Sequence, residues 1–219
     1  AAFANCTSLE TIAFADGNDP LKIGKNAFFG CAAETLTVPA RVNSVGAYAF
    51  ANMSALAEFT LNARLTEIPE GMLRGTAVTS FTVKDYVTSI GAYALAGYDA
   101  RELFPDAYRP TLEQEAAAKG KLETLVFEGT SQLTYIGVGA FAYTKLTAFA
   151  LPDTVKTIDE MAFYDADGLA SFTVNAESAL QTIGVYALAG TAVGEIFIPG
   201  NVERIYPRAF YGSALGKIT

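Results

Sequence analysis

The chain of 219 residues contains no histidine and only two cysteines. The lack of histidine removes both the usual general base of nucleophilic catalysis and the commonest metal ligand. Two cysteines are too few for a disulfide framework. We therefore expect neither a catalytic centre nor a cofactor or metal, and we predict that the protein is not an enzyme.

Positive charge is also scarce, because 15 lysines and arginines face 23 aspartates and glutamates, which gives a net charge of −8. Nucleic acids and anionic membrane surfaces demand a basic face, so both are excluded as partners. The sequence has no apolar run of about 18 residues, and it does not open with a basic segment followed by an apolar one. We expect no membrane insertion of this segment, and no signal peptide or anchor within it.

Apolar residues are abundant, at 51% of the chain, and they follow a repeat. An Ile-Gly step, an Ala-Phe pair and a run of the form L-x-x-F-x-L recur in this order, as in residues 136–152. The Phe of the pair, or the Leu in its place, stands at Phe3, Phe28, Phe50, Leu73, Leu95, Phe141, Phe163, Leu188 and Phe210. Successive copies lie 22 to 25 residues apart, except for one interval of 46. A period of this length predicts a repeat solenoid.

Each part of the repeat predicts a local structure. Apolar and polar positions alternate at the end of the L-x-x-F-x-L run, which predicts one short parallel strand per repeat. The Ile-Gly step, for example at Gly91 or Gly137, predicts a tight corner in which glycine takes a positive φ. The Ala-Phe pair predicts a single helical or 3₁₀ turn on the opposite wall. Stacked copies then share a core that one repeat cannot bury alone.

Two copies show a familiar consensus in full. One holds Leu151-Pro152, Val155, Ile158, Ala162-Phe163 and Leu169, and the other holds Ile198-Pro199, Val202, Ile205, Ala209-Phe210 and Leu215. This pattern resembles the BspA-like type of the leucine-rich-repeat family. The resemblance implies a right-handed β/α superhelix over residues 1–219, with about nine repeats and a wall of short helical or 3₁₀ turns and loops. It also implies an extracellular or cell-surface adhesion module that binds host or cell-surface proteins or glycans, and it brings no catalytic residues.

The outward face of the stacked strands is the first candidate binding surface. Its central column includes Thr60, Thr82, Val126, Ala150, Thr173 and Phe197, and the preceding column includes Glu58 and Glu195. Threonine suits any strand, so most of this face equally fits an ordinary solvated sheet, whereas the outward Phe197 does not. Glu58 and Glu195 lie five rungs apart, about 24 Å, so they cannot act together on one glycosidic bond.

The second candidate is the segment 98–121, which interrupts the repeats and holds nine charged residues out of 24. Its candidate binding residues are Tyr98, Arg101, Phe104, Tyr108 and Arg109. Thr111 can cap a short helix near residues 112–119. Insertions in solenoids often lie on the binding face, but long surface loops are also tolerated at small cost, and both interpretations stay open.

Three further expectations concern the cysteines, the ends and the role of the chain. Cys6 and Cys31 follow the aligned Phe of adjacent copies, so a disulfide is conceivable, although the sequence favours two buried free thiols. Both ends fall inside a repeat without a polar cap, which predicts a segment of a longer protein or end-to-end contacts through the termini. Besides a binding module, a structural spacer of a larger surface protein fits these features. An enzyme acting on glycans or peptides has only scattered carboxylates in its favour.

Overall fold

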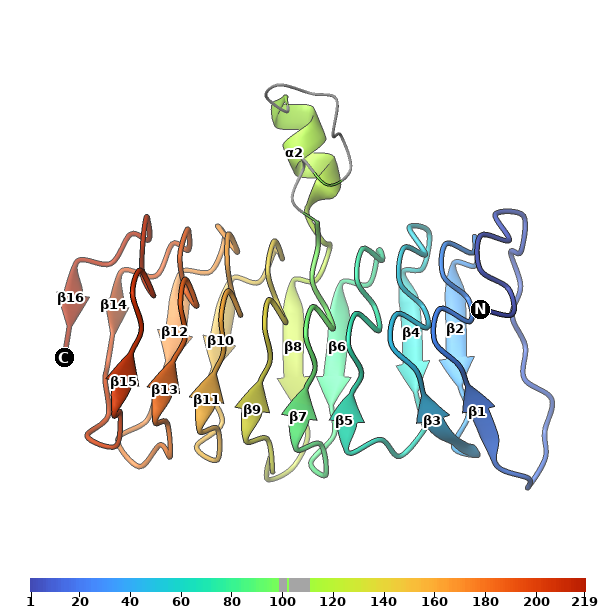
Figure 1. Ribbon diagram of the computed structural model, residues 1–219, viewed down its shortest axis with the longest axis horizontal. Coiled ribbons are helices and arrows are strands. Elements are labelled where there is room, and N and C mark those ends of the chain that lie inside the picture. The colour runs from blue at the N-terminus through green and yellow to red at the C-terminus, as the bar shows by residue number, and fades with distance from the viewer. Residues whose placement is uncertain (99–101, 103–110) are drawn as a thin grey trace.

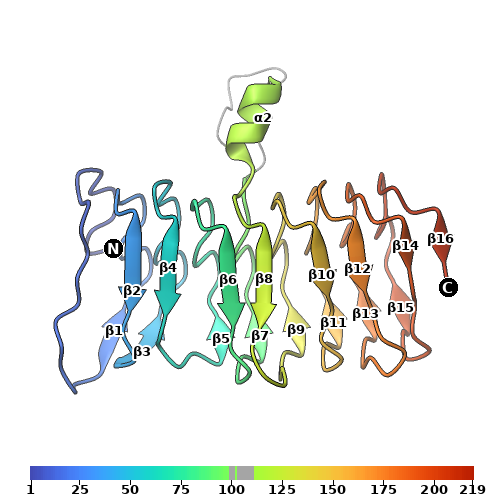
Figure 2. The same ribbon diagram turned by 180° about the vertical axis from the view of Figure 1, so that it is seen from behind.

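The computed structural model describes residues 1–98, 102 and 111–219 of the chain. The chain coils into an elongated solenoid built from two facing layers of short strands (Figure 1). Each turn of the coil passes along one layer, crosses a wall of turns, and returns along the other layer. The odd-numbered strands form the layer nearer the viewer in Figure 1, and the even-numbered strands form the layer nearer the viewer in Figure 2.

The described residues form eight strands in each layer. The odd-numbered strands are β1 (Leu21–Ile23), β3 (Val42–Val45), β5 (Glu67–Ile68), β7 (Ser89–Ile90), β9 (Tyr135–Ile136), β11 (Thr157–Ile158), β13 (Thr182–Ile183) and β15 (Arg204–Ile205). The even-numbered strands are β2 (Thr35–Val38), β4 (Glu58–Leu61), β6 (Ser80–Val83), β8 (Thr124–Phe127), β10 (Ala148–Ala150), β12 (Ser171–Thr173), β14 (Glu195–Ile196) and β16 (Lys217–Ile218). One helix, α2 (Leu112–Ala118), projects from the wall of turns in the middle of the solenoid (Figure 1).

The prediction of a repeat solenoid with parallel strands is confirmed, because every strand pair of the described residues is parallel, and all of them except the irregular pair β1–β3 keep one register. Isoleucines stack on isoleucines along the odd-numbered layer, as Ile136 pairs with Ile158 and Ile158 with Ile183. Strands β5 to β15 form one six-stranded sheet, while β1 and β3 pair separately. The even-numbered strands pair two by two, as β2–β4, β6–β8, β10–β12 and β14–β16.

The core lies between the two layers and is filled by the repeated apolar positions. Phe50, Phe141 and Phe163 have no exposed surface. The rings of Phe141 and Phe163 stack with their centroids 5.1 Å apart, so the aligned phenylalanines of neighbouring turns contact one another directly. Burial of the repeated side chains in a continuous stack is the main source of stability for a solenoid.

The structure adds a second strand to the one that the sequence predicted for each repeat. These additional odd-numbered strands end at the corner isoleucine of each repeat, or at Val45 in β3, and most are only two residues long. They are too short to produce an alternating sequence pattern. The first copy of the repeat, near Phe3, forms no strand in residues 3–17.

The wall of turns is not helical, in contrast to the expectation of helical or 3₁₀ turns. Its N–H groups alternate between two kinds of partner. Phe141 donates to the carbonyl of Ala162 on the next turn (2.8 Å), whereas Ala142 donates within its own turn to the carbonyl of Gly139, three residues earlier (3.0 Å). A helix would need all of these N–H groups for local bonds. The residue before each Ala-Phe pair takes a positive φ of 53 to 62°; these residues are Asn26, Tyr48, Gly71, Tyr93, Gly139, Met161, Tyr186 and Arg208.

The glycines of the Ile-Gly step do not take positive φ, so the predicted reason for them is wrong. At Gly184, and at Gly46, which follows Val45 at the equivalent corner, the lack of a side chain lets neighbouring turns approach closely. A Cβ atom on Gly46 would lie 2.4 Å from the backbone nitrogen of Lys25, and one on Gly184 would lie 2.5 Å from the carbonyl carbon of Asp159. Contacts this short do not occur, so a side chain at these positions would force the turns apart.

Both cysteines are free, and no disulfide is formed between the first two turns. Cys31 is buried and donates its S–H to the carbonyl of Phe3, with 3.1 Å between sulfur and oxygen. Cys6 is exposed, so the expectation of two buried thiols is correct for Cys31 only. Burial raises the pKa of the Cys31 thiol, and the neighbouring Cys6 raises it further.

Candidate functional site

The outward face of the even-numbered strands presents two columns of exposed side chains (Figure 2). The strand registers align them as predicted, because Thr37 lies beside Thr60, Thr82 beside Val126, and Ala150 beside Thr173. The preceding column contains Glu58 beside Thr35 and Glu195 beside Lys217. Every candidate residue of this face is exposed, and the apolar Val126 and Phe197 are 45% and 37% exposed.

The columns do not form one continuous ladder. No pairing joins β4 to β6 or β8 to β10 among the described strands, so Thr60 and Thr82 lie on opposite sides of one break and Val126 and Ala150 on opposite sides of another. The break between β4 and β6 opens a shallow cavity of about 170 Å³ with both threonines in its lining. The even face is therefore divided into segments, each of which presents its own outward residues.

A second hollow lies at the C-terminal end of the face, over β12, β14 and β16. It has a volume of about 600 Å³, and its lining includes Phe197, Thr173, Glu195, Lys217 and Thr219. Lys217 bonds to the carboxylate of Glu195 across the strands, with 2.5 Å between nitrogen and oxygen. The hollow therefore combines one exposed aromatic ring with an ion pair and hydroxyl groups, which supply both donors and acceptors.

The carboxylates Glu58 and Glu195 are not brought together. They lie on β4 and β14, with four even-numbered strands between them. Among the described residues, no group of three or more cysteine or acidic side chains is arranged to hold a metal ion.

The insertion begins and ends at backbone hydrogen bonds that attach it to the solenoid. The N–H of Tyr98 donates to the carbonyl of Ala118 (3.0 Å), and the N–H of Gly120 donates to that of Tyr143 (2.9 Å). Helix α2 starts at a capping box, in which Thr111 and Gln114 exchange backbone-to-side-chain bonds of 2.9 and 3.2 Å. The base of the insertion is therefore anchored to the wall of turns.

Arg74 is the central residue of this attachment. Its guanidinium lies between the rings of Tyr93 and Tyr98, at 4.7 and 4.4 Å from their centroids. It also donates to the carbonyl of Gly97 at 3.3 Å and to both carboxylate oxygens of Glu102 at 2.8 and 2.9 Å. A guanidinium can stack on two rings and donate several hydrogen bonds at once, so it holds the surrounding groups in place better than an ammonium would.

On the other side of the insertion, Lys119 forms ion pairs with Asp165 (3.8 Å between nitrogen and oxygen) and with Asp167. No sequence pattern indicated that Arg74 or these aspartates anchor the insertion, because their partners lie on other turns of the solenoid. Tyr98, predicted as a binding residue, is half-buried beneath Arg74, and burial raises the pKa of its phenol. The other candidates, Arg101, Phe104, Tyr108 and Arg109, lie outside the described residues.

These stacked parallel strands and inward apolar ladders define the class of the protein as a leucine-rich-repeat solenoid. The sequence matches the model of the BspA-type leucine-rich repeat region over residues 1–100 and 111–219, in six copies. The chain therefore belongs to that family. No helix in the described part of the chain is long and apolar enough to cross a membrane.

Several solved structures are similar to the chain at low identity. A leucine-rich repeat protein from Bacteroides ovatus is 18% identical, with a TM-score of 0.49, and the match covers 90% of this chain and 57% of that one. A leucine-rich cell surface protein from Faecalibacterium prausnitzii is 17% identical, with a TM-score of 0.41 and coverage of 90% and 50%. The pneumococcal vaccine antigen PcpA is 12% identical, with a TM-score of 0.39 and coverage of 85% and 62%. The chain thus spans between half and two thirds of the length of these proteins. No curated protein matches the sequence.

Proposed function

We propose that this chain is a non-catalytic interaction module of an extracellular or cell-surface protein. Its ligand is a protein or glycan on a host cell or a neighbouring cell. The ligand is bound on the outward face of the even-numbered strands, and the insertion supplies a second contact. Membership of the BspA-type leucine-rich-repeat family supports an interaction module, and the exposed strand face supplies the surface.

The observation that carries this proposal is the exposed ring of Phe197 in a column that otherwise holds threonine, alanine and valine. The ring is 37% exposed and borders the hollow of about 600 Å³ over β12, β14 and β16. Aromatic side chains are enriched at the centres of protein interfaces, where they bury a large area at small entropic cost. A ring of this kind also stacks against the C–H face of a sugar, while Thr173 and the Glu195–Lys217 pair offer hydrogen bonds to hydroxyl groups.

The anchored insertion supports the second contact. Helix α2 projects beyond the end of β8, near the middle of the even face (Figure 2). Arg74 on one turn and Asp167 on another, which pairs with Lys119 of the insertion, hold its base from either side. An attachment that is ordered before binding reduces the entropy lost when a ligand is captured.

A binding screen with one matched pair of variants tests the proposal. Wild-type protein, Phe197→Ala and Thr37→Ala are compared on immobilised extracellular matrix proteins and mucin glycans. Thr37 lies on the same outward face, on β2 at the far end of the solenoid. We expect binding of at least one ligand, a loss of about 30-fold for Phe197→Ala, as for an aromatic hot spot, and little change for Thr37→Ala.

Circular dichroism melting serves as the folding control, because both side chains are exposed and neither change should shift the melting temperature appreciably. Wild-type protein that binds none of these ligands would overturn the proposal. So would a Phe197→Ala variant that binds as well as wild type. Replacement of residues 98–121 by a short glycine linker measures the contribution of the insertion separately.

A further inference from the structure

The odd-numbered layer, on the other side of the solenoid from the proposed binding face, contains one break. Along β5 to β15 the residue after each isoleucine donates its N–H to the isoleucine carbonyl of the preceding turn. These bonds measure 2.8 to 2.9 Å and join Gly91 to Ile68, Gly137 to Ile90, Asp159 to Ile136, Gly184 to Ile158 and Tyr206 to Ile183. Gly46 bonds to Ile23 in the same way. The ladder is interrupted only between β3 and β5 among the described odd-numbered strands.

Proline explains the break. Pro69 occupies the position of the donor, and proline has no N–H. Consequently no backbone N–H of the described residues donates to the carbonyl of Val45. The N–H of Thr66 also has no backbone acceptor within the described part of the chain. The turns stay joined at the neighbouring wall, where Tyr48 donates its N–H to the carbonyl of Glu70 (2.8 Å). The strands are therefore open to an incoming group while the solenoid remains continuous.

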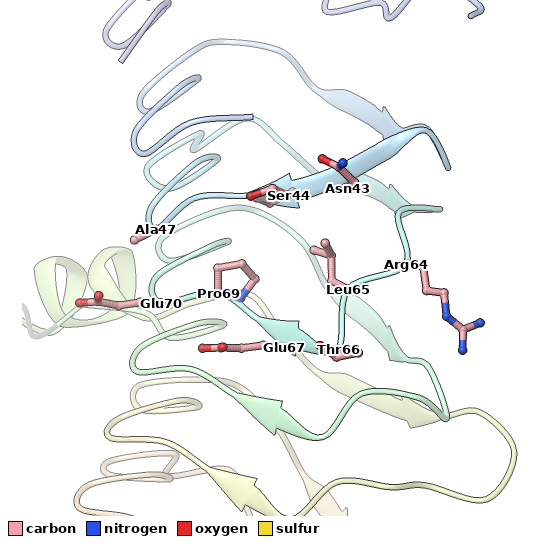
Figure 3. Close-up of a pocket in the computed structure, with 10 residues that line it drawn as sticks. Asn43, Ser44, Ala47, Arg64, Leu65, Thr66, Glu67, Pro69 and Glu70 are labelled. Atoms are coloured by element: carbon pink, nitrogen blue, oxygen red, sulfur yellow. The ribbon is translucent and has the colours of Figure 1, made fainter. Parts of the chain in front are cut away.

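The break forms a groove of about 410 Å³ between β3 and β5 (Figure 3). Asn43 and Ser44 line one side, and Thr66, Glu67 and Glu70 line the other. All five of these residues are exposed. The groove thus has polar side chains on both walls and free backbone groups at its base.

The charges of the groove are arranged along its length. Glu67 and Glu70 point to the same end, and Arg64 points to the opposite end (Figure 3). Each charged end is held from outside the groove, because the hydroxyl of Tyr48 donates to Glu70 (2.9 Å) and the guanidinium of Arg64 lies 4.5 Å from the ring centroid of Tyr86. The end with the two glutamates therefore presents two carboxylates, which act as hydrogen-bond acceptors for a ligand.

We propose that this groove binds an extended segment of a partner protein that carries an arginine side chain. A guanidinium has five N–H donors and no acceptor, which matches two carboxylates, and the segment's backbone has the groups that Val45 and Thr66 leave unpaired. Addition of a peptide to free strand edges is a common mode of recognition, in which the backbone gives affinity and the side chains give specificity.

Calorimetric titration at low salt tests the proposal with a defined probe. The probe is the blocked pentapeptide glycine–arginine–threonine–arginine–glycine, and its counterpart contains citrulline, a neutral isostere of arginine. We expect the arginine peptide to bind and the citrulline peptide to bind at least about tenfold more weakly. Equal binding of the two peptides, or no binding of either, would overturn the proposal.

Two variants locate the site. Pro69→Ala restores an N–H at the break, and we expect it to close the ladder, to protect the new amide at position 69 from hydrogen exchange, and to abolish binding while every charge is kept. Glu67→Gln/Glu70→Gln is expected to weaken binding about tenfold. Its matched control, Glu160→Gln/Glu203→Gln, removes two exposed carboxylates elsewhere and should bind as wild type. Wild-type affinity in Pro69→Ala, or equal losses in the two double variants, would show that the peptide is attracted only by the net negative charge.

Discussion

Two glycines of the same sequence motif are expected to respond in opposite ways to the addition of one methyl group. Gly24 and Gly184 both follow the isoleucine of an Ile-Gly step, and neither takes a positive φ. A Cβ on Gly184 would lie 2.5, 2.6 and 2.8 Å from three backbone atoms of Asp159 and Glu160, whereas a Cβ on Gly24 would meet nothing within 4 Å. The two sites therefore separate the packing of neighbouring turns from the conformational preference of glycine.

For Gly184→Ala the conflicting atoms belong to the backbone of the preceding turn, so no side-chain rotation relieves them. Overpacking of this kind costs about 1–3 kcal/mol of unfolding free energy. For a domain of this size the melting temperature should fall by about 2–4 °C per kcal/mol. For Gly24→Ala we expect a gain of about 0.4–1 kcal/mol, because alanine restricts the unfolded chain and fits the native backbone without strain.

Urea unfolding followed by circular dichroism measures both effects, with the midpoint reporting stability and an unchanged slope reporting a comparable unfolding transition. A double variant should show the sum of the two changes, since the sites lie on distant turns. Equal destabilisation by the two single substitutions would refute the explanation from close approach and would return the motif to a purely conformational role.

Three further outcomes follow from the side-chain contacts. Arg74→Lys should speed hydrogen exchange of the backbone amides that attach the insertion, because an ammonium cannot stack between two rings and fork to a carboxylate, and mass-spectrometric exchange will detect it. The pKa of Tyr48 is raised to about 12, by burial first and then by the bond to Glu70. Its neutral form therefore stabilises the fold up to about pH 10, and this contribution is lost between about pH 10 and 12. Because burial is the larger cause, Glu70→Gln should lower the pKa of Tyr48 only in part, as measured by tyrosinate absorbance. At about pH 8 the thiol reagent dithiobis(nitrobenzoate) should label exposed Cys6 quickly and buried Cys31 only after unfolding. Rapid labelling of both cysteines would contradict the burial of Cys31.

The repeated part of the fold was predictable from the sequence because each apolar position of the repeat occupies the same place in the core of every turn. The spacing of 22 to 25 residues identified Phe50, Phe141 and Phe163 as core residues, and all three are fully buried. The alternation at the end of each run identified the even-numbered strands and their outward columns. These features depend on the local residue pattern and on the stacking of equal repeats, and both can be recognised in the sequence alone.

Other features depend on contacts that sequence spacing does not show. The left-handed residues before the Ala-Phe pairs include Tyr48 and Tyr93, and bulky side chains rarely adopt that backbone conformation. The structure explains them by what lies beside each ring: a Cβ on Gly71 would fall 2.2 Å from the ring of Tyr48, and one on Gly139 would fall 2.4 Å from that of Tyr93. The tyrosine of one turn thus covers the glycine of the next, a relationship between turns that no single copy reveals. The attachment of the insertion by Arg74 was missed for the same reason.

A general consequence concerns where ligands can be recognised on this solenoid. A residue that obeys the repeat is largely dictated by its neighbours in the stack, so its identity reports packing more than binding. Residues that depart from the repeat are not explained in this way, and the structure places three such departures at distinct surface features. Phe197 replaces the outward threonine beside the hollow over β12, β14 and β16; Pro69 replaces the donor at the break between β3 and β5; and the segment 98–121 interrupts the wall of turns. Because the three lie on different faces, each can be removed without disturbing the others, and their contributions to binding should be separable by substitution.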